Sequence, residues 1–539
     1  MNKLFPNRNL RWILLGLLFT YSSCELYELD YITSLDKLED YYYKANFAVP
    51  LVNSALKVQD IIEPDTIDLV EVDEDNLIWI VYSSGNAYTK TAGEVYSIED
   101  QSSDFSLQIS PSLIKSQQTI DQTFPFVYEG EERVDSIRFL NATLIVEVES
   151  QQLQEDGYDL EVSFAIPDSY DENGDPLQNT FLLTEQLTEV DLSGYTIVFQ
   201  NEGGANFFDV QYLLTLTGNG TPSQAEYTVN FLQKVQNIEF DVIYGYIGTF
   251  EFELGNGDLE INLFEDVQFG GVYFKNPMID MFVTNFFGLE IDMAVVADFL
   301  INDGAETLEL EIYEPGLDPW RLQSPAFLGD SVVNTEQFNR SNTNVFDAIA
   351  SLPEEFSYLI TCMANPDQNP DKENFVSHDS KLNFEMEFNL PMDMRVEEID
   401  LQSTFDFSFG EDLASENLDS VKLKVLIEND FPLQGLMEIY FLDESGDTLA
   451  ALFDQPELQP LFDAAPAEDQ FSTTTTEIKL TSDKIEKLFQ AKSFGIHSKL
   501  STRDSTDPDS YVKFYDDHQI RVKIGAIISA NTLLEYDPI

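Results

Sequence analysis

Residues 142–150 read ATLIVEVES and residues 158–166 read YDLEVSFAI. In both stretches apolar and polar side chains alternate, which puts the apolar ones on one face of an extended strand. The residues Val, Ile, Phe and Tyr, which favour strands, are plentiful in them. The pattern recurs from about residue 46 onward, at 75–84, 195–200, 248–254, 308–314, 381–390, 421–429 and 520–528. Gly, Asn and Asp clusters separate these runs, so the sequence predicts an all-β protein of tandem antiparallel β-sandwiches.

Helices are expected to be few and short. The stretch 482–492, SDKIEKLFQAK, predicts one helix, in which Asp483 would be the N-cap and Glu486 stands three residues later in capping-box spacing. The stretch 334–352, NTEQFNRSNTNVFDAIASL, predicts a second helix.

The chain also repeats itself. VDSIRFLNATLIVEV (134–148) matches LDSVKLKVLIEN (418–429), and YDENGDPL (170–177) matches LDESGDTL (442–449) in the same order. A third relative, MIDMFVTNFFGLEIDMAVVADF (278–299), places Asn285-Phe286-Phe287-Gly288-Leu289 where Asn429-Asp430-Phe431-Pro432-Leu433 stands. A strand, an Asn and an apolar corner with Gly or Pro, then a second strand, predicts a compact bend between packed sheets.

That strand–corner–strand unit resembles the β-sandwich of late-embryogenesis-abundant proteins of the water-stress-hypersensitivity type. The resemblance covers about two dozen residues in each copy, and it carries over no individual residue. It implies a binding or scaffolding sandwich without catalytic residues.

The D-E-x-G-D turns invite a comparison with calcium loops. Asp171, Asn173 and Asp175 alternate oxygen ligands, but an EF-hand needs Gly at its sixth position and Glu at its twelfth, where this chain has Pro176 and Leu182. Gly174 falls where a tight hairpin needs a residue at positive φ. We therefore expect plain turns here and at Asp443–Asp447, with weak calcium sites as the alternative.

The N-terminus predicts a membrane anchor. Lys3, Arg8 and Arg11 precede the short apolar run 12–19, and residues 19–28 read FTYSSCELYE. A basic segment, a short apolar segment and small residues before a cleavage point are the marks of a secretory signal. Cys24 at that point resembles the bacterial lipoprotein pattern, which implies diacylglycerol on its sulfur and cleavage just before it. Tyr21 departs from that pattern, which usually has an aliphatic residue there, and an ordinary secretory signal is the alternative.

The charge of the chain limits the classes of molecule to which it can bind. The chain has 98 acidic and 28 basic residues, a formal net charge of −70, and no basic cluster along its sequence. Such a chain is not suited to binding a nucleic-acid backbone, which depends on clustered Lys and Arg. The same charge opposes adsorption to anionic lipid, so acyl chains on Cys24 would have to hold the protein to a membrane. Acidic residues just after that cysteine resemble the surface-export signal of Bacteroidota lipoproteins.

The length suggests several domains. We expect a signal peptide at 1–23, an acidic tether at 24–45 with a helical turn near 35–43, and an N-terminal sandwich region at 46–232. A middle sandwich at 233–320, a β-rich region with a helical insert at 321–415 and a C-terminal sandwich at 416–539 would follow.

Residues that could carry chemistry are sparse. Cys362 lies in an alternating apolar run far in sequence from His378, His497 and His518, so we expect it to be a buried small hydrophobe. Trp79, in LIWIVY, is expected in the core, whereas Trp320, in a Pro- and Gly-rich loop beside Arg321, either packs that loop or contacts a partner or glycan. The sequence has no G-x-S-x-G, P-loop, H-E-x-x-H or C-x-x-C motif.

These observations predict a non-enzymatic outer-membrane lipoprotein without cofactor or metal, similar to Bacteroidota envelope lipoproteins, that acts as a scaffold, accessory or binding protein for an envelope partner. A carrier or sensor of an apolar ligand is one alternative, because the 41 Phe residues could line a greasy cavity. A polysaccharide-acting enzyme is the other, and it would need two carboxyl groups facing each other across a cleft.

Overall fold

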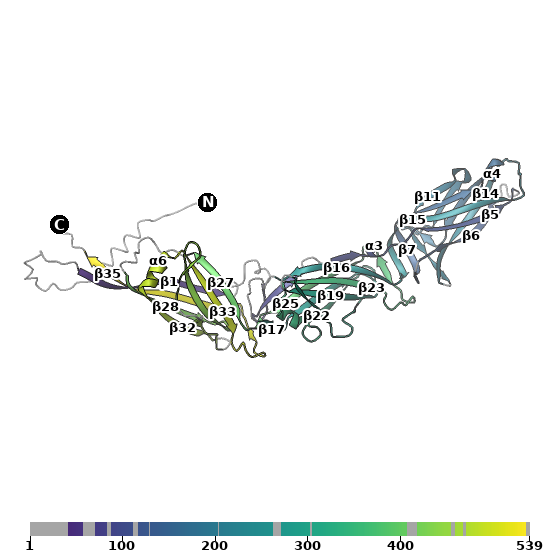
Figure 1. The fold of residues 1–539 in the computed structure, drawn as a ribbon. Coiled ribbons are helices and arrows are strands. Elements are labelled where there is room, and N and C mark those ends of the chain that lie inside the picture. The colour runs from purple at the N-terminus through teal and green to yellow at the C-terminus, as the bar shows by residue number, and fades with distance from the viewer. Residues whose placement is uncertain are drawn as a thin grey trace, which may run out of the picture.

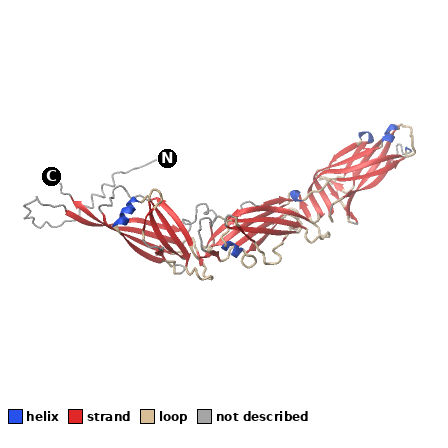
Figure 2. Cartoon of the chain, in the orientation of Figure 1, coloured by secondary structure: helices blue, strands red, loops and turns tan. Residues whose placement is uncertain are grey.

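The computed structural model describes residues 41–57, 70–83, 88–111, 117–128, 130–202, 204–261, 271–301, 304–406, 418–453, 459–466 and 470–534. Cys24, the signal peptide and most of the predicted tether lie outside these residues. The described chain consists mainly of antiparallel strands, and the predicted all-β class is confirmed. Three β-sandwiches follow one another in an elongated row (Figures 1 and 2). We refer to them as the terminal, central and distal sandwiches.

The terminal sandwich contains both ends of the described chain. One sheet has the order β1 (Tyr41–Lys57), β35 (Gln519–Leu534), β28 (Leu418–Asn429), β32 (Ser472–Leu480). The other has the order β27 (Ile399–Asp406), β33 (Ser493–Thr502), β29 (Leu433–Leu442), β30 (Thr448–Ala451), with β31 (Gln459–Phe462) also on β29. Helix α6 (Ser482–Gln490) is the first predicted helix, but its N-cap is Thr481, whose hydroxyl accepts from the Lys484 N–H at 3.4 Å, and not Asp483.

The central sandwich lies in the middle of the row. One sheet has the order β2 (Val70–Val72), β3 (Ile78–Ser83), β25 (Lys381–Pro391), β18 (Met278–Asn285), β22 (Val332–Phe338), with β4 (Tyr88–Thr91) also on β25. The other has the order β16 (Phe250–Glu260), β23 (Glu355–Ala364), β19 (Ile291–Ile301), β20 (Glu306–Glu309), with β21 (Trp320–Leu322) also on β19.

The distal sandwich lies at the end of the row farthest from β1 and β35 (Figure 1). One sheet has the order β10 (Leu177–Leu182), β8 (Tyr158–Ile166), β14 (Ala205–Gly218), β13 (Gln200–Glu202), with β6 (Gln117–Phe126) on β14. The other has the order β24 (Phe375–Ser377), β15 (Tyr227–Tyr246), β7 (Arg133–Glu149), β12 (Thr196–Val198), β9 (Ser169–Tyr170), with β11 (Leu187–Asp191) on β7 and β5 (Gln101–Ile109) on β15. Its short helical segments are α4 (Gln151–Glu155) and the 3₁₀ turn η4 (Leu183–Glu185).

Short elements join the sandwiches. Helix α3 (Ala92–Val95) precedes the distal sandwich, and β24 reaches from the central part of the chain to pair with β15. Between the central and terminal sandwiches a small sheet has the order β17 (Val272–Phe274), β26 (Asp393–Val396), β34 (Val512–Lys513). One cluster of buried apolar side chains runs from the distal sandwich into the near part of the terminal one, and a second cluster lies around α6.

The sandwiches are nested in the chain rather than consecutive. Strand β1 pairs with β35 along its length, from Tyr41 opposite Leu534 to Lys57 opposite Gln519. The central sandwich is therefore inserted into the terminal one, and the distal sandwich into the central one. This arrangement departs from the predicted sequential division, because residues 41–45 belong to β1 and β15 runs through the expected boundary between 232 and 233. Alternation identifies a strand but does not identify its partner.

The second predicted helix is correct only in its last third. Residues 332–338 form β22, which pairs with β18, and only α5 (Val345–Ala350) is helical. Asn344 precedes α5 and fixes its start, because its side-chain amide donates to the Glu309 carbonyl at 2.8 Å and its carbonyl accepts from the Glu311 N–H at 2.8 Å.

The sequence repeats correspond to equivalent corners. Asn285 ends β18 and Asn429 ends β28, and both side chains are fully buried. The Asn285 carbonyl accepts from the Phe287 N–H at 2.8 Å, and that of Asn429 accepts from the Phe431 N–H at 2.9 Å. In each case the chain then crosses to the opposite sheet. In the distal sandwich, β7 contains the corresponding repeat, and the short helix α4 takes the place of the asparagine corner between β7 and β8.

Candidate functional site

A cavity of about 520 Å³ lies at the junction between the central and terminal sandwiches. We call it the junction cavity. Its apolar lining is Leu77, Trp79, Met278 and Pro391, and its polar lining includes Asn276, Gln337, Asn339, Arg340, Ser341, Asp393 and Lys513. These residues come from β3, β25 and the ends of β18 and β22 in the central sandwich, and from β26 and β34 in the small sheet beside it.

Trp79 supplies the aromatic surface of the cavity. The prediction that it belongs to the core is wrong, because Ile78 and Ile80 point inward on β3 and Trp79, between them, is only half-buried. Its indole N–H donates to Oδ2 of Asp73 at 3.0 Å. The ring is thereby held in one orientation.

Asp73 is itself fixed by a tight turn. Its Oδ1 accepts from the backbone N–H groups of Asp75 and Leu77, both at 2.9 Å, and Asn76 has φ of 64°. The indole hydrogen bond, with these backbone bonds and the charge of Lys513, lowers the pKa of Asp73. The carboxylate that orients Trp79 is therefore favoured in its ionised form.

Amide side chains at the end of β22 form a fixed rim. The Gln337 amide donates to Asp280 at 2.8 Å, and its carbonyl accepts from Asn339 at 3.3 Å. The Asn339 carbonyl in turn accepts from the Ser341 N–H at 2.9 Å. Asn276 is exposed, and its side chain makes no hydrogen bond with any other described residue.

Two basic side chains that line the cavity, Arg340 and Lys513, do not form an ion pair with any described residue. The Arg340 guanidinium lies 3.8 Å from the centroid of the Phe346 ring, and Lys513 lies on β34. Within the described ranges neither forms an ion pair, although the charge of Lys513 reaches Asp73. Asp393, the acidic residue of the lining, is mostly buried and lies 3.3 Å from Nζ of Lys275. The cavity lining therefore carries two basic side chains against one acidic side chain, with the Asp73 carboxylate within the reach of Lys513, in a strongly anionic molecule.

A second, smaller cavity adjoins the first and shares Asp393 and Lys513 with it. Its volume is about 160 Å³, and its other lining residues include Lys275, Asp430, Arg503, Tyr511 and His518. The Arg503 guanidinium donates to the Ala465 carbonyl at 2.8 Å. Basic side chains are thus concentrated on both sides of β34.

Chemically, the junction cavity offers an aromatic face, fixed amides and two cations with free hydrogen-bonding capacity. Such a set binds a ligand that has both an apolar face and a negative charge. Among the described residues no group of three or more His, Cys, Asp and Glu side chains is placed to hold a metal ion.

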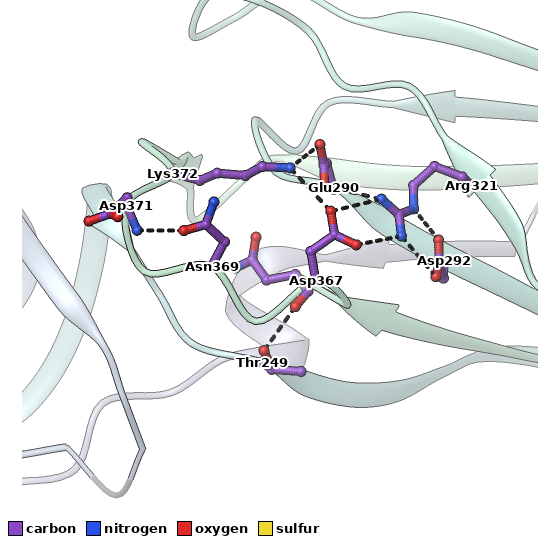
Figure 3. A network of polar contacts seen from close by, with 9 residues as sticks. Thr249, Glu290, Asp292, Arg321, Asp367, Asn369, Asp371 and Lys372 are labelled. Atoms are coloured by element: carbon purple, nitrogen blue, oxygen red, sulfur yellow. Dashed lines mark hydrogen bonds and ion pairs between the residues drawn. The ribbon is translucent and has the colours of Figure 1, made fainter.

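Trp320, considered from sequence as a partner contact, instead packs its loop. It lies on β21 opposite Met293 and is 8% exposed. The neighbouring Arg321 lies in an ion network with Glu290, Asp292, Asp367 and Lys372 (Figure 3).

That network ties a loop to the sheet. Nη2 of Arg321 lies 3.1 Å from Asp367, and Nη1 lies 3.2 Å from Glu290. The Asp292 and Asp367 carboxylates raise the pKa of Arg321, and Arg321 lowers that of Asp367. Every charge in the network has an opposite neighbour, so it fastens residues 365–372 beside β19 and β21.

The remaining sequence candidates lie apart from one another. Cys362 on β23 is 2% exposed, and burial raises the pKa of its thiol to about 12, so the expected buried hydrophobe is confirmed. His378 lies beside Asp379, His497 lies on β33, and His518 lines the smaller cavity.

The aspartate turns have the predicted plain geometry. In both copies the first carboxylate accepts two N–H groups of its own loop: Asp171 those of Asn173 and Asp175, and Asp443 those of Ser445 and Asp447. Gly174 and Gly446 have φ of 85° and 84°, as expected. The turn at Asp73 is a third copy that sequence reasoning missed, because Asn76 replaces the glycine.

One close carboxylate pair lies on a sheet face. Glu387 of β25 stands opposite Asp280 of β18, and burial, followed by the charge of Asp280, raises the pKa of Glu387. Asp280 accepts hydrogen bonds from Gln337 and Asn389. Neither carboxylate belongs to the lining of the junction cavity.

The predicted lipid attachment at Cys24 lies outside the described residues. Within the ranges that are described, no helix has the length and apolar character needed to cross a membrane.

Comparison with known proteins gave only distant matches. No family model and no curated protein matches the chain. A crystal structure of a protein thought to be secreted by Parabacteroides distasonis aligns over 89% of this chain and 99% of its own, with 9% identity and a TM-score of 0.29. A structure of the Gx strain of infectious bursal disease virus aligns over 87% and 86%, with 8% identity and a TM-score of 0.16. At TM-scores this low the matches do not establish a shared fold.

Proposed function

We propose that the chain is an outer-membrane lipoprotein of the Bacteroidota type that acts as a non-catalytic stalk and binding protein of the cell envelope. Acyl groups on Cys24 would anchor it. The terminal sandwich would lie nearest the membrane, and the distal sandwich would be presented to a partner.

The observation that carries the proposal is the pairing of β1 with β35. Tyr41 lies 17 positions after Cys24 and opposite Leu534, at the end of the row that holds both chain ends (Figure 1). A lipid on Cys24 would therefore be connected to the row through the terminal sandwich, and the long axis of the row would separate that point of connection from the distal sandwich.

Charge supports the same reading. With a formal net charge of −70, the folded surface is repelled by anionic headgroups, which favours a molecule that stands away from the bilayer on an acyl anchor. Two acyl chains bind a membrane stably because each buried methylene contributes about 0.8 kcal/mol.

Cys24→Ala tests the anchor. We expect this variant to keep its signal peptide and to incorporate no labelled palmitate, whereas Ser22→Ala, a matched neighbour, should be processed and labelled like the parent. Processing and labelling of Cys24→Ala in the manner of the parent would overturn the proposal.

The partner is tested separately in intact cells. A photo-cross-linking residue at Leu187 of the distal sandwich, which is 45% exposed and pairs with Glu147 near the α4 end, should capture an envelope protein. The same probe at Ile527 of the terminal sandwich, 41% exposed, should capture it less. Equal capture at both sites would contradict the presentation of the distal end.

A further inference from the structure

We propose that the junction cavity binds a sugar that carries a carboxylate, either as a free sugar acid or as one residue of an acidic glycan. This goes beyond the proposed stalk function, and it does not depend on how the chain is anchored.

The first step of the argument is charge. The chain has 98 acidic and 28 basic residues, so most of its surface repels an anion. At the junction cavity Arg340 and Lys513 both face the same space without an ion-pair partner among the described residues, and Lys275 lies against Asp393. Cations gathered in a cleft focus the local potential, and an anion would therefore collect here.

The second step is the shape of the anion. Arg340 lies over Phe346, which restricts the guanidinium plane and prepares it for a planar, two-oxygen acceptor. A carboxylate has that geometry. Lys513, on β34 of the small sheet between the sandwiches, lines the same cavity and supplies a second charge.

The third step is the body of the ligand. Trp79 presents a half-buried indole whose N–H is already occupied by Asp73, so its contribution to a ligand is its apolar surface. Stacking on an aromatic face suits the C–H face of a pyranose. Asn276 has a free side-chain amide, and Gln337 and Asn339 each keep one N–H beyond those that they donate to Asp280 and to Gln337, respectively. Convergent amides match a ring of hydroxyl groups.

The fourth step is preorganisation. The Asp73 turn holds Trp79, and the hydrogen bonds through Gln337 and Asn339 hold the rim. Groups that are fixed before binding lose little conformational entropy when a ligand arrives. The cavity, about 520 Å³, is large enough for one sugar residue with room for its neighbours.

The test is calorimetric titration of the full chain, purified in detergent, with four probes. D-glucuronate carries the charge and the ring, D-glucuronamide the ring alone, inorganic phosphate a charge alone, and octanoate a carboxylate on an apolar chain. We expect D-glucuronate to bind with a dissociation constant on the order of 0.1–1 mM, the range open to a ligand of about a dozen heavy atoms. D-glucuronamide should bind about tenfold or more weakly.

Variants locate the site. Arg340→Gln and Lys513→Gln remove exposed charges and should each weaken D-glucuronate binding by about tenfold. Trp79→Phe keeps an aromatic ring of smaller area and should weaken the acid and the amide alike. Arg138→Gln, an exposed arginine of the distal sandwich, is the matched control and should bind like the parent.

Three results would overturn the inference. The first is the absence of D-glucuronate binding, and the second is equal binding by the parent and both charge variants. The third is binding of phosphate or octanoate as tightly as D-glucuronate, which would leave a simple anion or fatty-acid site. None of these results bears on Cys24, so the anchoring proposal would stand or fall by its own experiment.

Discussion

Among single residues, the buried asparagines Asn285 and Asn429 each stabilise a corner at which the chain crosses from one sheet to the opposite sheet. Asn429 donates to the carbonyls of Phe431, Leu433 and Asp463 at 3.2, 2.8 and 2.9 Å. Its own carbonyl accepts from the Phe431 N–H. A backbone corner in a sandwich interior has polar groups that cannot reach water, and this one side chain satisfies several of them.

Replacing Asn429 by Ala should therefore be costly. We expect Asn429→Ala to lower the free energy of unfolding of the terminal sandwich by about 2–4 kcal/mol, because buried backbone groups lose their partners. Urea unfolding followed by hydrogen exchange of residues 425–435 measures it. Asn173→Ala, in an exposed turn, is the control and should change stability by less than about 0.5 kcal/mol. If Asn429→Ala lowered the free energy of unfolding as little as the control does, water would have replaced the Asn429 side chain as the hydrogen-bond partner of the corner.

Individual residues were predicted unevenly from sequence. The Asn285 and Asn429 corners were found because a repeat aligned them, and Cys362 because alternation marked it as buried. Trp79 was misassigned because a strand buries every second residue, and the run LIWIVY does not show which set points inward. The role of Asp73 was missed because its turn contains Asn76 at positive φ instead of glycine.

At the scale of elements, strand pairing brings like charges together on one face. Glu387 of β25 and Asp280 of β18 are directly opposite, and Glu71 and Glu385 are also close enough to raise the pKa of Glu387. Burial is the larger cause of this shift. Like charges directly opposite each other in a sheet are destabilising.

Removing the Glu387 charge should stabilise the protein in a pH-dependent manner. A carboxyl whose pKa is raised in the folded state does not reduce the free energy of unfolding at a pH below its ordinary pKa of about 4.5, because it is then protonated. As the pH rises through the folded pKa, the group becomes charged and the free energy of unfolding falls. Glu387→Gln should thus match the parent below about pH 4.5 and exceed it at pH 7. We expect a gain of a few tenths of a kcal/mol, because solvent screens the pair.

Denaturant unfolding from pH 4 to pH 8 measures this difference. Glu161→Gln, on an exposed position of β8, removes one negative charge from the same molecule without that opposed pair. A difference that is independent of pH, or equal to that of Glu161→Gln, would contradict the prediction.

Elements were predicted well where local chemistry decides them. Alternation identified the strands, and Asp and Gly identified two hairpin turns. The stretch 334–352 was predicted as one helix, but pairing of β22 with β18 converts its first residues into a strand, and tertiary contacts of this kind override local propensity. The junction cavity could not be predicted, because its residues range from Leu77 to Lys513 and only the fold brings them together.

At the scale of the whole molecule, the insertion of one sandwich into another makes β1, the first described strand, depend on β35, the last one, for its pairing. Strand β35 lies between β1 and β28 in its sheet, so β1 depends on it for its backbone pairing and β28, which also pairs with β32, depends on it along one edge. Sequence could not reveal this, because the pairing joins residues at opposite ends of the chain.

Ending the chain after His518 removes β35 and tests this dependence. We expect the terminal sandwich to become sensitive to limited proteolysis, since β1 and β28 lose their shared neighbour, while the central and distal sandwiches stay protected. Mass spectrometry of the resistant fragments measures it. A chain that ends at Leu534 keeps all of β35 and should resist like the parent; equal resistance of the shorter chain would show that β35 is dispensable.

Because the backbone travels outward and then returns, the segment from β5 to β15, which forms the distal sandwich except β24, is joined to the rest of the chain by two covalent connections, one at each end. A protease that cuts only one of them, for example between α3 and β5, leaves the far part attached through the returning segment after β15. In a milieu rich in hydrolases, such a nicked molecule would still hold whatever cargo its tip carries. Shedding would require two separate cleavages at the same joint.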